Sequence, residues 1–456
     1  MMLSRGRLGL EKKKLYIQTF GCQMNVQDTE KMVALLRGSG YRTTDDPEQA
    51  DLILVNTCGI REKAAQKVYS QLGRFRILKQ RKPGLMIGVG GCLAQHLGNR
   101  LFQRAPYVNL VFGTHQIHRL PEMVANLEGS GGRVSETGFC ERVRSLDIPA
   151  QPAPGAVSTY VTIMQGCNNF CSYCVVPHLR GREESRSLTE ILREVEALAD
   201  RGIREVTLLG QNVNSYGQTL TDRRDFAELV REIAQVPGID RIRFTTSHPK
   251  DLSSRLIACF GTVAPLCEHI HLPVQSGSDR VLKRMNRGYT AAEYRKKVEA
   301  LREVCPWISV TSDVIVGFPG EEEADFQQTL DLMREVRFDN LFSFQYSKRE
   351  GTAAAGMDDP VPGDVKRERL RRLQTLQEEH ALEKNLACVG RPEEVLVEGA
   401  SRNKPVEMTG RTRGNRIVNF PGTADLIGKI VPVRIVDAFL HSLRGEMEKR
   451  GDEDVH

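Results

Sequence analysis

Short apolar runs that alternate with helical patterns open the chain. Three such runs, each followed by a stretch of helical periodicity, are Lys14–Phe20, Asp51–Asn56 and Leu85–Val89. Apolar runs of this length separated by helical segments are typical of a parallel α/β sheet. The pattern therefore predicts an open parallel α/β sheet domain over residues 14–128.

Beyond a break, the same alternation resumes over a longer stretch. The break, rich in glycine and proline, predicts a linker over residues 129–157. Six apolar runs with helical patterns between them follow it: Tyr160–Met164, Glu205–Leu209, Arg241–Thr246, His269–Val274, Ser309–Val316 and Asn340–Tyr346. Six successive strand–helix units predict a partial (β/α)6 barrel over residues 158–388, trailing helix included. Its working face would be the C-terminal end of the strands.

The last part of the chain changes to short alternating runs punctuated by turn residues. These runs are Glu394–Val397, Val406–Thr412, Arg416–Phe420 and Ile430–Val436. They predict a small antiparallel β-barrel over residues 389–447. The expected fold class is thus α/β, in three parts: an open parallel sheet, a partial barrel and a small antiparallel barrel.

Composition and charge narrow the class of protein. Lys and Arg number 64 against 58 Asp and Glu, a mild excess that is compatible with a polyanionic partner. No apolar run approaches the ~20 residues of a membrane helix, and the basic start has no apolar stretch behind it, so we expect a cytoplasmic protein without membrane association. The 11 cysteines, an odd number, favour metal or redox chemistry over a disulfide framework.

The densest cysteine motif directly follows the first predicted barrel strand. Cys167, Cys171 and Cys174 form a C-x3-C-x2-C pattern within one loop. A 4Fe–4S cluster normally takes four cysteines, so three would leave one iron open to bind a substrate. A zinc site with His178 as the fourth ligand is the alternative.

Three further cysteines stand far apart in sequence but at equivalent places. Cys22, Cys58 and Cys92 each follow the end of one of the three N-terminal strands. Ligands of open parallel sheets gather at the carboxyl ends of the strands, so we expect the three thiols to converge. Buried structural thiols are the alternative, since free cysteine buries readily.

The C-x3-C-x2-C motif resembles the signature of the radical S-adenosylmethionine (SAM) superfamily, whose open iron binds SAM. The resemblance implies that Tyr173 lies near the adenine. By the same resemblance, further cofactor-binding residues follow later strands: Gly210, Gln211 and Asn212, then Gln275 and Ser276, then Gly317. Arg180 and Arg182 are candidate partners of the SAM carboxylate because guanidinium and carboxylate pair well. Solvated arginines are the alternative.

The resemblance narrows to the methylthiotransferases, which share this order of three parts. The segments Gly21–Asn25, Asn56–Arg61, Gly90–Cys92 and Gly210–Asn214 resemble the branch that acts on isopentenylated adenosine in tRNA. This resemblance implies methylthiolation of N6-isopentenyladenosine next to the anticodon, using two SAM molecules. It also implies two 4Fe–4S clusters, with the transferred sulfur carried on the auxiliary one at Cys22, Cys58 and Cys92. No catalytic side chain is expected beyond the cluster ligands.

The alternatives within and outside this family stay open at this stage. Sister branches act on threonylcarbamoyl-adenosine in tRNA or on a ribosomal protein, and a non-catalytic iron–sulfur RNA-binding protein is the remaining alternative. The C-terminal barrel resembles the RNA-binding TRAM domain. Its candidate RNA-binding residues are Lys404, Arg411, Arg413 and Arg416, although surface charge that merely solvates the fold would look the same. Expected partners are the tRNA anticodon stem-loop and a low-potential electron donor of the flavodoxin or ferredoxin type, with the protein itself a monomer.

Overall fold

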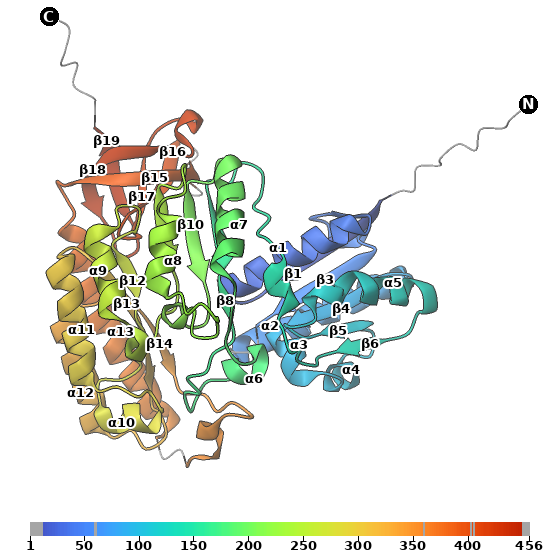
Figure 1. The fold of residues 1–456 in the computed structure, drawn as a ribbon. Helices are drawn as coiled ribbons and strands as arrows, with labels where there is room; N and C mark the ends of the chain where they lie inside the picture. The colour runs from blue at the N-terminus through green and yellow to red at the C-terminus, as the bar shows by residue number, and fades with distance from the viewer. Residues whose placement is uncertain (1–11, 59–61, 359–360, 402–403, 405, 449–456) are drawn as a thin grey trace, which may run out of the picture. The chain divides into compact units, whose positions relative to one another are not determined.

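The computed structural model describes residues 12–448 apart from 59–61, 359–360, 402–403 and 405 (Figure 1). The chain divides into two compact units. Unit 1 comprises Met1–Gln151 together with His178–Gly181, and unit 2 comprises Pro152–Pro177 together with Arg182–His456. Within the described ranges, no helix has both the length and the apolar character that a membrane crossing requires.

Unit 1 is built on a six-stranded parallel sheet with strand order β2-β1-β3-β4-β5-β6. Its strands are β1 (Lys13–Thr19), β2 (Tyr41–Thr43), β3 (Leu52–Thr57), β4 (Met86–Gly91), β5 (Leu110–Phe112) and β6 (Val134–Glu136). Its helices include α1 (Gln23–Gly38), α2 (Glu62–Arg81), α3 (Cys92–Leu97), α4 (Arg100–Arg104) and α5 (Leu120–Ser130). The sheet confirms the predicted fold class of this part.

The two faces of the sheet carry separate hydrophobic cores. Ile53 and Val55 of β3 belong to one core, with side chains of α2, α3 and α4, whereas Leu52 and Leu54 belong to the other, with side chains of α1 and α5. Every residue of β3 is buried because this central strand is covered on both faces. Such burial explains why β3 reads as a continuous apolar run.

The predicted linker over residues 129–157 differs from the structure. Part of this stretch forms β6, which pairs with β5 as the sixth strand of the sheet, and a 3-10 helix over Arg144–Asp147 follows. The strand was missed because β6 has only three residues, all partly buried, and lies at the edge of the sheet. So short a run carries too few positions to show a period.

Unit 2 begins with the partial barrel. Its parallel strands are β7 (Ser158–Thr162), β10 (Glu205–Leu209), β11 (Arg241–Phe244), β12 (His269–His271), β13 (Ser309–Val316) and β14 (Asn340–Gln345). They form two three-stranded sheets, and a parallel bridge between Ile242 and Leu266 links β11 to the segment before β12. The helices are α7 (Leu188–Asp200), α8 (Phe226–Ile233), α9 (Ser254–Thr262), α10 (Asp279–Arg284), α11 (Ala291–Val304), α12 (Glu323–Val336) and α13 (Gly363–Leu386). The predicted six strand–helix units are all present.

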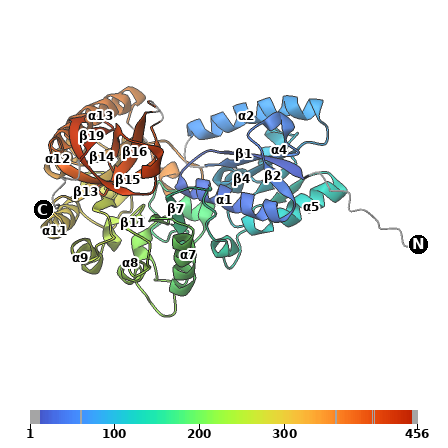
Figure 2. The same cartoon turned by 90° about the horizontal axis from the view of Figure 1, so that it is seen from above.

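The C-terminal part of unit 2 is a closed five-stranded barrel, drawn in red in Figure 2. Its strands are β15 (Pro392–Ala400), β16 (Glu407–Thr412), β17 (Ile417–Pro421), β18 (Ile430–Ala438) and β19 (Leu443–Met447). Adjacent strands are antiparallel except β17 and β19, which pair in parallel. The barrel was predicted, but the one parallel pair was not, because pairing direction depends on how the sheet closes and leaves no trace in the alternation.

Buried arginines fix this small barrel to the large one. Arg241 donates to the carbonyl oxygens of Arg411 (2.7 Å) and Glu394 (2.8 Å), and Arg243 donates to those of Thr412 (2.7 Å) and Arg413 (2.9 Å). Because Arg241 and Arg243 lie on β11, the small barrel rests on the large barrel through main-chain acceptors that any sequence would provide. The contact is therefore invisible to sequence patterns.

Candidate metal centres

Three cysteines of unit 1 meet at one edge of its sheet. Cys22 is the residue before α1, Cys58 directly follows β3, and Cys92 is the first residue of α3 after β4. Strands β1, β3 and β4 are parallel neighbours, so their carboxyl ends share this edge. Cys58 and Cys92 are buried, and Cys22 is exposed. The convergence expected from sequence is present.

Two glycines allow the three cysteine segments to approach closely. A Cβ at Gly21 would lie 2.9 Å from Cβ of Cys58, and a Cβ at Gly91 would lie 2.4 Å from Oδ1 of Asn56. Gly91 also has a φ of +87°, which disfavours other residues. The space beside Cys58 thus exists only because the neighbouring positions lack side chains.

The donor set at this edge fits an iron–sulfur cluster. The pKa of the Cys92 thiol is raised to about 11, mainly by burial, with the neighbouring Cys58 and Cys22 adding to the rise and Arg180 opposing it. Three clustered thiolates require a bound cation to be stable together. Among the residues described, no three His, Cys, Asp or Glu side chains are arranged around a single metal ion. A cubane binds each thiolate through a different iron, so it accepts ligands that are spread more widely.

Arg180, one of the two candidate partners of the SAM carboxylate, lies at this same edge of unit 1. Its Nη2 donates to Oδ2 of Asp28 (2.7 Å) and to Oδ1 of Asn25 (3.3 Å). Only 3% of Arg180 is exposed. Burial alone would lower the pKa of its guanidinium, but Asp28, Cys92 and Cys22 raise it above its ordinary value. The side chain is therefore a buried cation beside the thiols.

Two side chains of unit 1 hold the Arg180 segment by its main chain. Oγ1 of Thr114 donates to the Leu179 carbonyl oxygen (2.7 Å), and Nε2 of His115 lies 2.9 Å from the Arg180 carbonyl oxygen. Burial lowers the pKa of His115, so its ring is neutral and Nε2–H donates to that carbonyl. Gly181 follows with a φ of +81°, a conformation that favours glycine. His178, the alternative zinc ligand, is exposed.

The C-x3-C-x2-C loop of unit 2 follows a short strand, β8 (Met164–Gln165). The pKa of Cys167 is raised to about 11 and that of Cys174 to about 12, mainly by burial, and the neighbouring Cys171 contributes to both rises. The three thiols thus lie close enough to repel one another as thiolates, the same condition as in unit 1. The loop is tied to the barrel by Ser172, whose Oγ donates to the Arg284 carbonyl oxygen (2.8 Å).

Sequence reasoning missed a second buried arginine at this loop. Nη1 of Arg287 lies 3.2 Å from Sγ of Cys171 and 3.4 Å from the Tyr173 hydroxyl, and Nη2 donates to the Pro273 carbonyl oxygen (2.8 Å). Burial by itself lowers the pKa of Arg287, but the tyrosines and Cys171 around it raise it well above its ordinary value. No motif marks Arg287, because its place depends on the turn after α10.

Two polar side chains that follow β10, those of Gln211 and Asn212, use only part of their hydrogen-bonding capacity. Oε1 of Gln211 accepts from the Gly166 amide (2.5 Å), and Nδ2 of Asn212 donates to Asp251 (2.7 Å). The other amide atoms, Nε2 of Gln211 and Oδ1 of Asn212, are buried and have no partner in the part of the chain that is described. Unpaired buried polar groups are rare, and a polar ligand such as SAM would satisfy them.

Two further residues at this end of the barrel were also missed. Burial raises the pKa of Glu183 to about 7, and Ser215 donates to its Oε2 (2.6 Å). Burial lowers the pKa of His248 to about 2, and its Nε2 lies 4.0 Å from Sγ of Cys171. The position of His248 soon after β11, at a strand's carboxyl end, is the signal that would have found it.

The remaining predicted cofactor residues lie in unit 2. Arg182 is exposed and its guanidinium lies 5.8 Å from the centre of the Phe170 ring. Tyr173 is partly buried and packs with Val281, Met285 and Phe318, whereas Gln275 and Ser276 are buried after β12. Gly317 follows β13 with a φ of +69°. Their contact with SAM stays a prediction.

The candidate RNA-binding residues of the small barrel already have partners. Arg413 donates to Glu268 (2.7 Å) and to the carbonyl oxygens of Ala264 and Leu266 (both 2.8 Å), and Arg416 pairs with Asp339 (2.5 Å). These two arginines therefore help to dock the small barrel on the large one. Within the small barrel itself, Arg411 pairs with Glu398 (3.1 Å) and Lys404 with Glu407 (3.6 Å). RNA binding by these four side chains stays a prediction.

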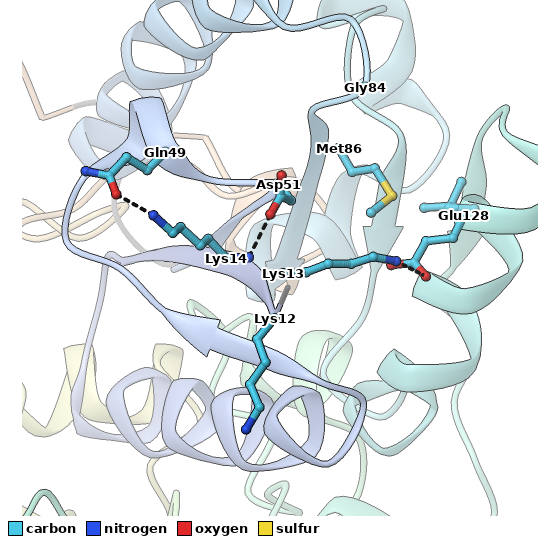
Figure 3. Close-up of a pocket in the computed structure, with 9 residues that line it drawn as sticks. Lys12, Lys13, Lys14, Gln49, Asp51, Gly84, Met86 and Glu128 are labelled. Carbon is cyan, nitrogen blue, oxygen red and sulfur yellow. Dashed lines mark hydrogen bonds and ion pairs between the residues drawn. The ribbon is translucent and has the colours of Figure 1, made fainter. Parts of the chain in front are cut away.

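A hollow of about 710 Å³ lies at the opposite end of the unit 1 sheet, where β1 and β4 begin (Figure 3). Its lysines are engaged: Nζ of Lys14 donates to Gln49 (2.6 Å), and Lys13 pairs with Glu128 (2.7 Å). None of the predicted site residues lines it. The hollow is thus separate from the cysteine edge of the same sheet.

Comparison with known proteins assigns the three parts. Residues 14–113 match the Uncharacterized protein family UPF0004, residues 161–333 the Radical SAM superfamily, and residues 386–447 the TRAM domain. A protein of Syntrophus aciditrophicus (strain SB), named tRNA-2-methylthio-N(6)-dimethylallyladenosine synthase, is 59% identical over 96% of this chain and 95% of its own. A protein of the same name from Geobacter sulfurreducens is 55% identical over 96% of this chain and 98% of its own.

Solved structures show likeness in fold. The radical S-adenosylmethionine methyltransferase TsrM from Kitasatospora setae, with cobalamin and a [4Fe-4S] cluster bound, superimposes with a TM-score of 0.55. It is 15% identical, and the match covers 76% of this chain and 77% of that one. The cobalamin-dependent radical enzyme OxsB gives a TM-score of 0.53 at 12% identity, covering 81% of this chain and 56% of that one.

Proposed function

This chain belongs to the family of tRNA-2-methylthio-N(6)-dimethylallyladenosine synthases, and we propose that it transfers a methylthio group to N6-isopentenyladenosine next to the anticodon of tRNA. The observation that carries this proposal is the pair of three-cysteine sites, one at the carboxyl ends of β1, β3 and β4 and one in the loop after β8. Each provides three thiols, which leaves one iron of a cubane open. The sequence identity to these relatives extends over both three-cysteine sites.

The six cysteines would hold the two clusters. Cys167, Cys171 and Cys174 would bind the cluster that activates SAM, and Cys22, Cys58 and Cys92 the auxiliary one. When bound, these groups supply a carbon radical able to abstract an unactivated aromatic hydrogen, a methyl group and the transferred sulfur. Two SAM molecules would be used, one as methyl donor and one as radical source.

The chain's own residues would bind SAM and stabilise the cluster that activates it. Arg287 donates to Sγ of Cys171 and thereby offsets thiolate charge inside the barrel. The unpaired amide atoms of Gln211 and Asn212 would bind polar groups of SAM, and the buried carboxyl of Glu183 is placed in the same unit to accept a proton or pair with an ammonium group. Arg182 remains the candidate for the SAM carboxylate.

The proposed reaction determines which partners the protein needs. The partner would be the tRNA anticodon stem-loop, with the C-terminal TRAM barrel contributing affinity, and the enzyme would work in the cytoplasm as a monomer. Reductive cleavage of SAM needs a low-potential electron, so a donor of the flavodoxin or ferredoxin type is required. The target nucleotide must leave its stack to reach a buried site.

A competition experiment tests the choice of substrate. The reconstituted protein would receive prenylated tRNA, threonylcarbamoylated tRNA and ribosomal protein together, under anaerobic reducing conditions, with products measured by mass spectrometry. We expect product on prenylated tRNA, because burial of the prenyl carbons contributes about 0.8 kcal/mol per CH₂-sized group. Product only on the protein would overturn the proposal, and product only on threonylcarbamoylated tRNA would assign the sister reaction.

A further inference from the structure

Arg180 has one half of its guanidinium engaged and one half free. Nη2 holds Asp28 and Asn25, whereas Nη1 is fully buried and finds no hydrogen-bond partner among the described residues. A buried, charged N–H donor without an acceptor is costly, so it marks the place of a missing ligand. The Asp28 carboxylate already serves Nη2, so the ligand at Nη1 is a second acceptor.

Asn25 links the engaged half of the Arg180 guanidinium to the cysteine site. Oδ1 of Asn25 lies 3.3 Å from Nη2 of Arg180 and 3.7 Å from Sγ of Cys22, so this one oxygen joins the arginine to the thiol site. The amide of Asn25 is fixed in turn, because its Nδ2 donates to the Phe20 carbonyl oxygen (3.3 Å) and to Asn56 (3.4 Å). A cationic donor held at a three-thiol site selects an anionic sulfur ligand.

We propose that Arg180 is a positioning residue of the auxiliary site, which donates a hydrogen bond through Nη1 to the sulfur ligand on the open iron. This inference rests on the proposed function, since it takes a cluster at Cys22, Cys58 and Cys92 as given. The segment 178–181 follows the SAM-cluster motif in sequence, yet it would serve the sulfur-carrying site. The guanidinium would hold the sulfur in one orientation and stabilise its negative charge.

The rival explanation is that Arg180 only anchors its segment through Asp28. Arg180→Lys separates the two, because an ammonium group keeps the charge and the pairing with Asp28 but cannot present a second, rigidly placed N–H. The double variant Asp28→Asn/Arg180→Gln removes the buried ion pair as a unit and avoids leaving either charge alone. Arg133→Lys is the matched control, since Arg133 lies in the same unit just before β6 and bonds only to the Pro106 carbonyl oxygen and the Phe102 ring among the contacts described.

The test uses the full chain in a Cys167→Ala/Cys171→Ala/Cys174→Ala background, so that one cluster remains. Iron and sulfide content report assembly, redox titration followed by electron paramagnetic resonance reports the reduction potential, and added sodium sulfide probes the open iron. We expect both Arg180 variants to retain the cluster but to bind sulfide about tenfold more weakly, which is the loss of one charge-assisted hydrogen bond. Their potential should shift to more negative values, since hydrogen bonds to cluster sulfur favour the reduced state.

Three outcomes would contradict either the role proposed for Arg180 or the function on which it rests. Unchanged sulfide affinity and potential in both variants would make Arg180 an anchor and overturn the proposal. Loss of the cluster in both variants, with Arg133→Lys intact, would assign Arg180 to folding of the site and overturn it as well. No cluster, or no sulfide binding, in the parent background would contradict the proposed function itself.

Discussion

At the scale of single residues, each cysteine site has one buried arginine beside it. Arg180 lies by the thiols of unit 1, and Arg287 lies 3.2 Å from Cys171 in unit 2. Both guanidinium groups are held by several acceptors, so their positions are fixed before any ligand arrives. A preformed cation lowers the free energy of an anionic centre without reorganisation. The two sites thus share an electrostatic design although their cysteines are spaced differently.

Single cysteine replacements should separate the two sites. Cys174→Ala should abolish deoxyadenosine formation from SAM, because the remaining two thiols cannot hold a three-cysteine cluster. Cys92→Ala should keep reductive SAM cleavage but lose methylthio product. Each variant should lose about four iron atoms per chain. Iron counting with chromatography of deoxyadenosine checks both, and Cys259→Ala, a buried cysteine outside both sets, is the control. Normal product from Cys92→Ala would refute the sulfur-carrying role.

The raised thiol pKa values predict how assembly depends on pH. With the pKa of Cys92 and Cys167 near 11 and that of Cys174 near 12, the free thiols are almost wholly protonated at neutral pH. Only thiolates bind iron, so each thiol must release a proton, and the thiolate fraction rises about tenfold per pH unit below the pKa. Cluster assembly in the apoprotein should therefore accelerate from about pH 7 to about pH 9, as followed by absorbance. A flat rate would show that deprotonation does not limit assembly.

At the scale of elements, arginines connect the two barrels of unit 2. Arg241 and Arg243 reach from β11 to main-chain carbonyls around β16, and Arg413 and Arg416 reach back to Glu268 and Asp339. Guanidinium suits this role because its planar donors satisfy several acceptors in fixed directions. The contact joins the start of β11, β12 and β14 to the small barrel, at the ends of the strands away from the C-x3-C-x2-C loop.

Removing Arg413 should loosen this contact. Arg413→Ala leaves Glu268 and two carbonyl oxygens without a donor, and we expect the free energy of unfolding to fall by about 2 kcal/mol. Lys404→Ala is the matched control, because the Lys404 side chain is exposed, such pairs contribute ~0–1 kcal/mol, and Glu407 keeps its ion pair with Arg444 (2.8 Å). Chemical denaturation measures both, and limited proteolysis shows whether the chain near Cys388 becomes accessible. Equal, small losses in the two variants would show that the docking arginines contribute little.

At the scale of the whole molecule, we expect the three parts to divide between chemistry and RNA recognition. Truncation after Cys388 removes the small barrel and should weaken tRNA binding while leaving deoxyadenosine formation largely intact, since Cys167, Cys171 and Cys174 all remain. Filter binding over a range of salt concentrations measures the loss, because each phosphate contact contributes about one unit to the slope. The single substitution Arg411→Gln in the full chain should also lower that slope. Undiminished affinity in the truncated protein would place RNA recognition elsewhere.

The parts and their order were predictable because periodicity records burial along each strand and helix. Cys22, Cys58 and Cys92 could be placed together from their position after successive strands, since parallel neighbours end at one edge. The contacts of Arg180 with Asp28 and Asn25 were not predicted, because these partners are more than 150 residues distant and no local pattern connects them. Arg287 and the arginine docking contacts were missed for the same reason, since each is decided by tertiary topology, whereas β6 was missed because it is too short to show a period.

The membership of residues 178–181 in unit 1 has a consequence for how the protein is made. A nascent chain that ends before His178 already contains the six-stranded sheet and the cysteines at its edge, yet it lacks the guanidinium that pairs with Asp28. The Asp28 carboxylate would then be buried without its cation, a costly arrangement that disfavours closure of the edge. We therefore expect the cysteine edge of unit 1 to close only after the C-x3-C-x2-C loop and the residues that follow it have been synthesised.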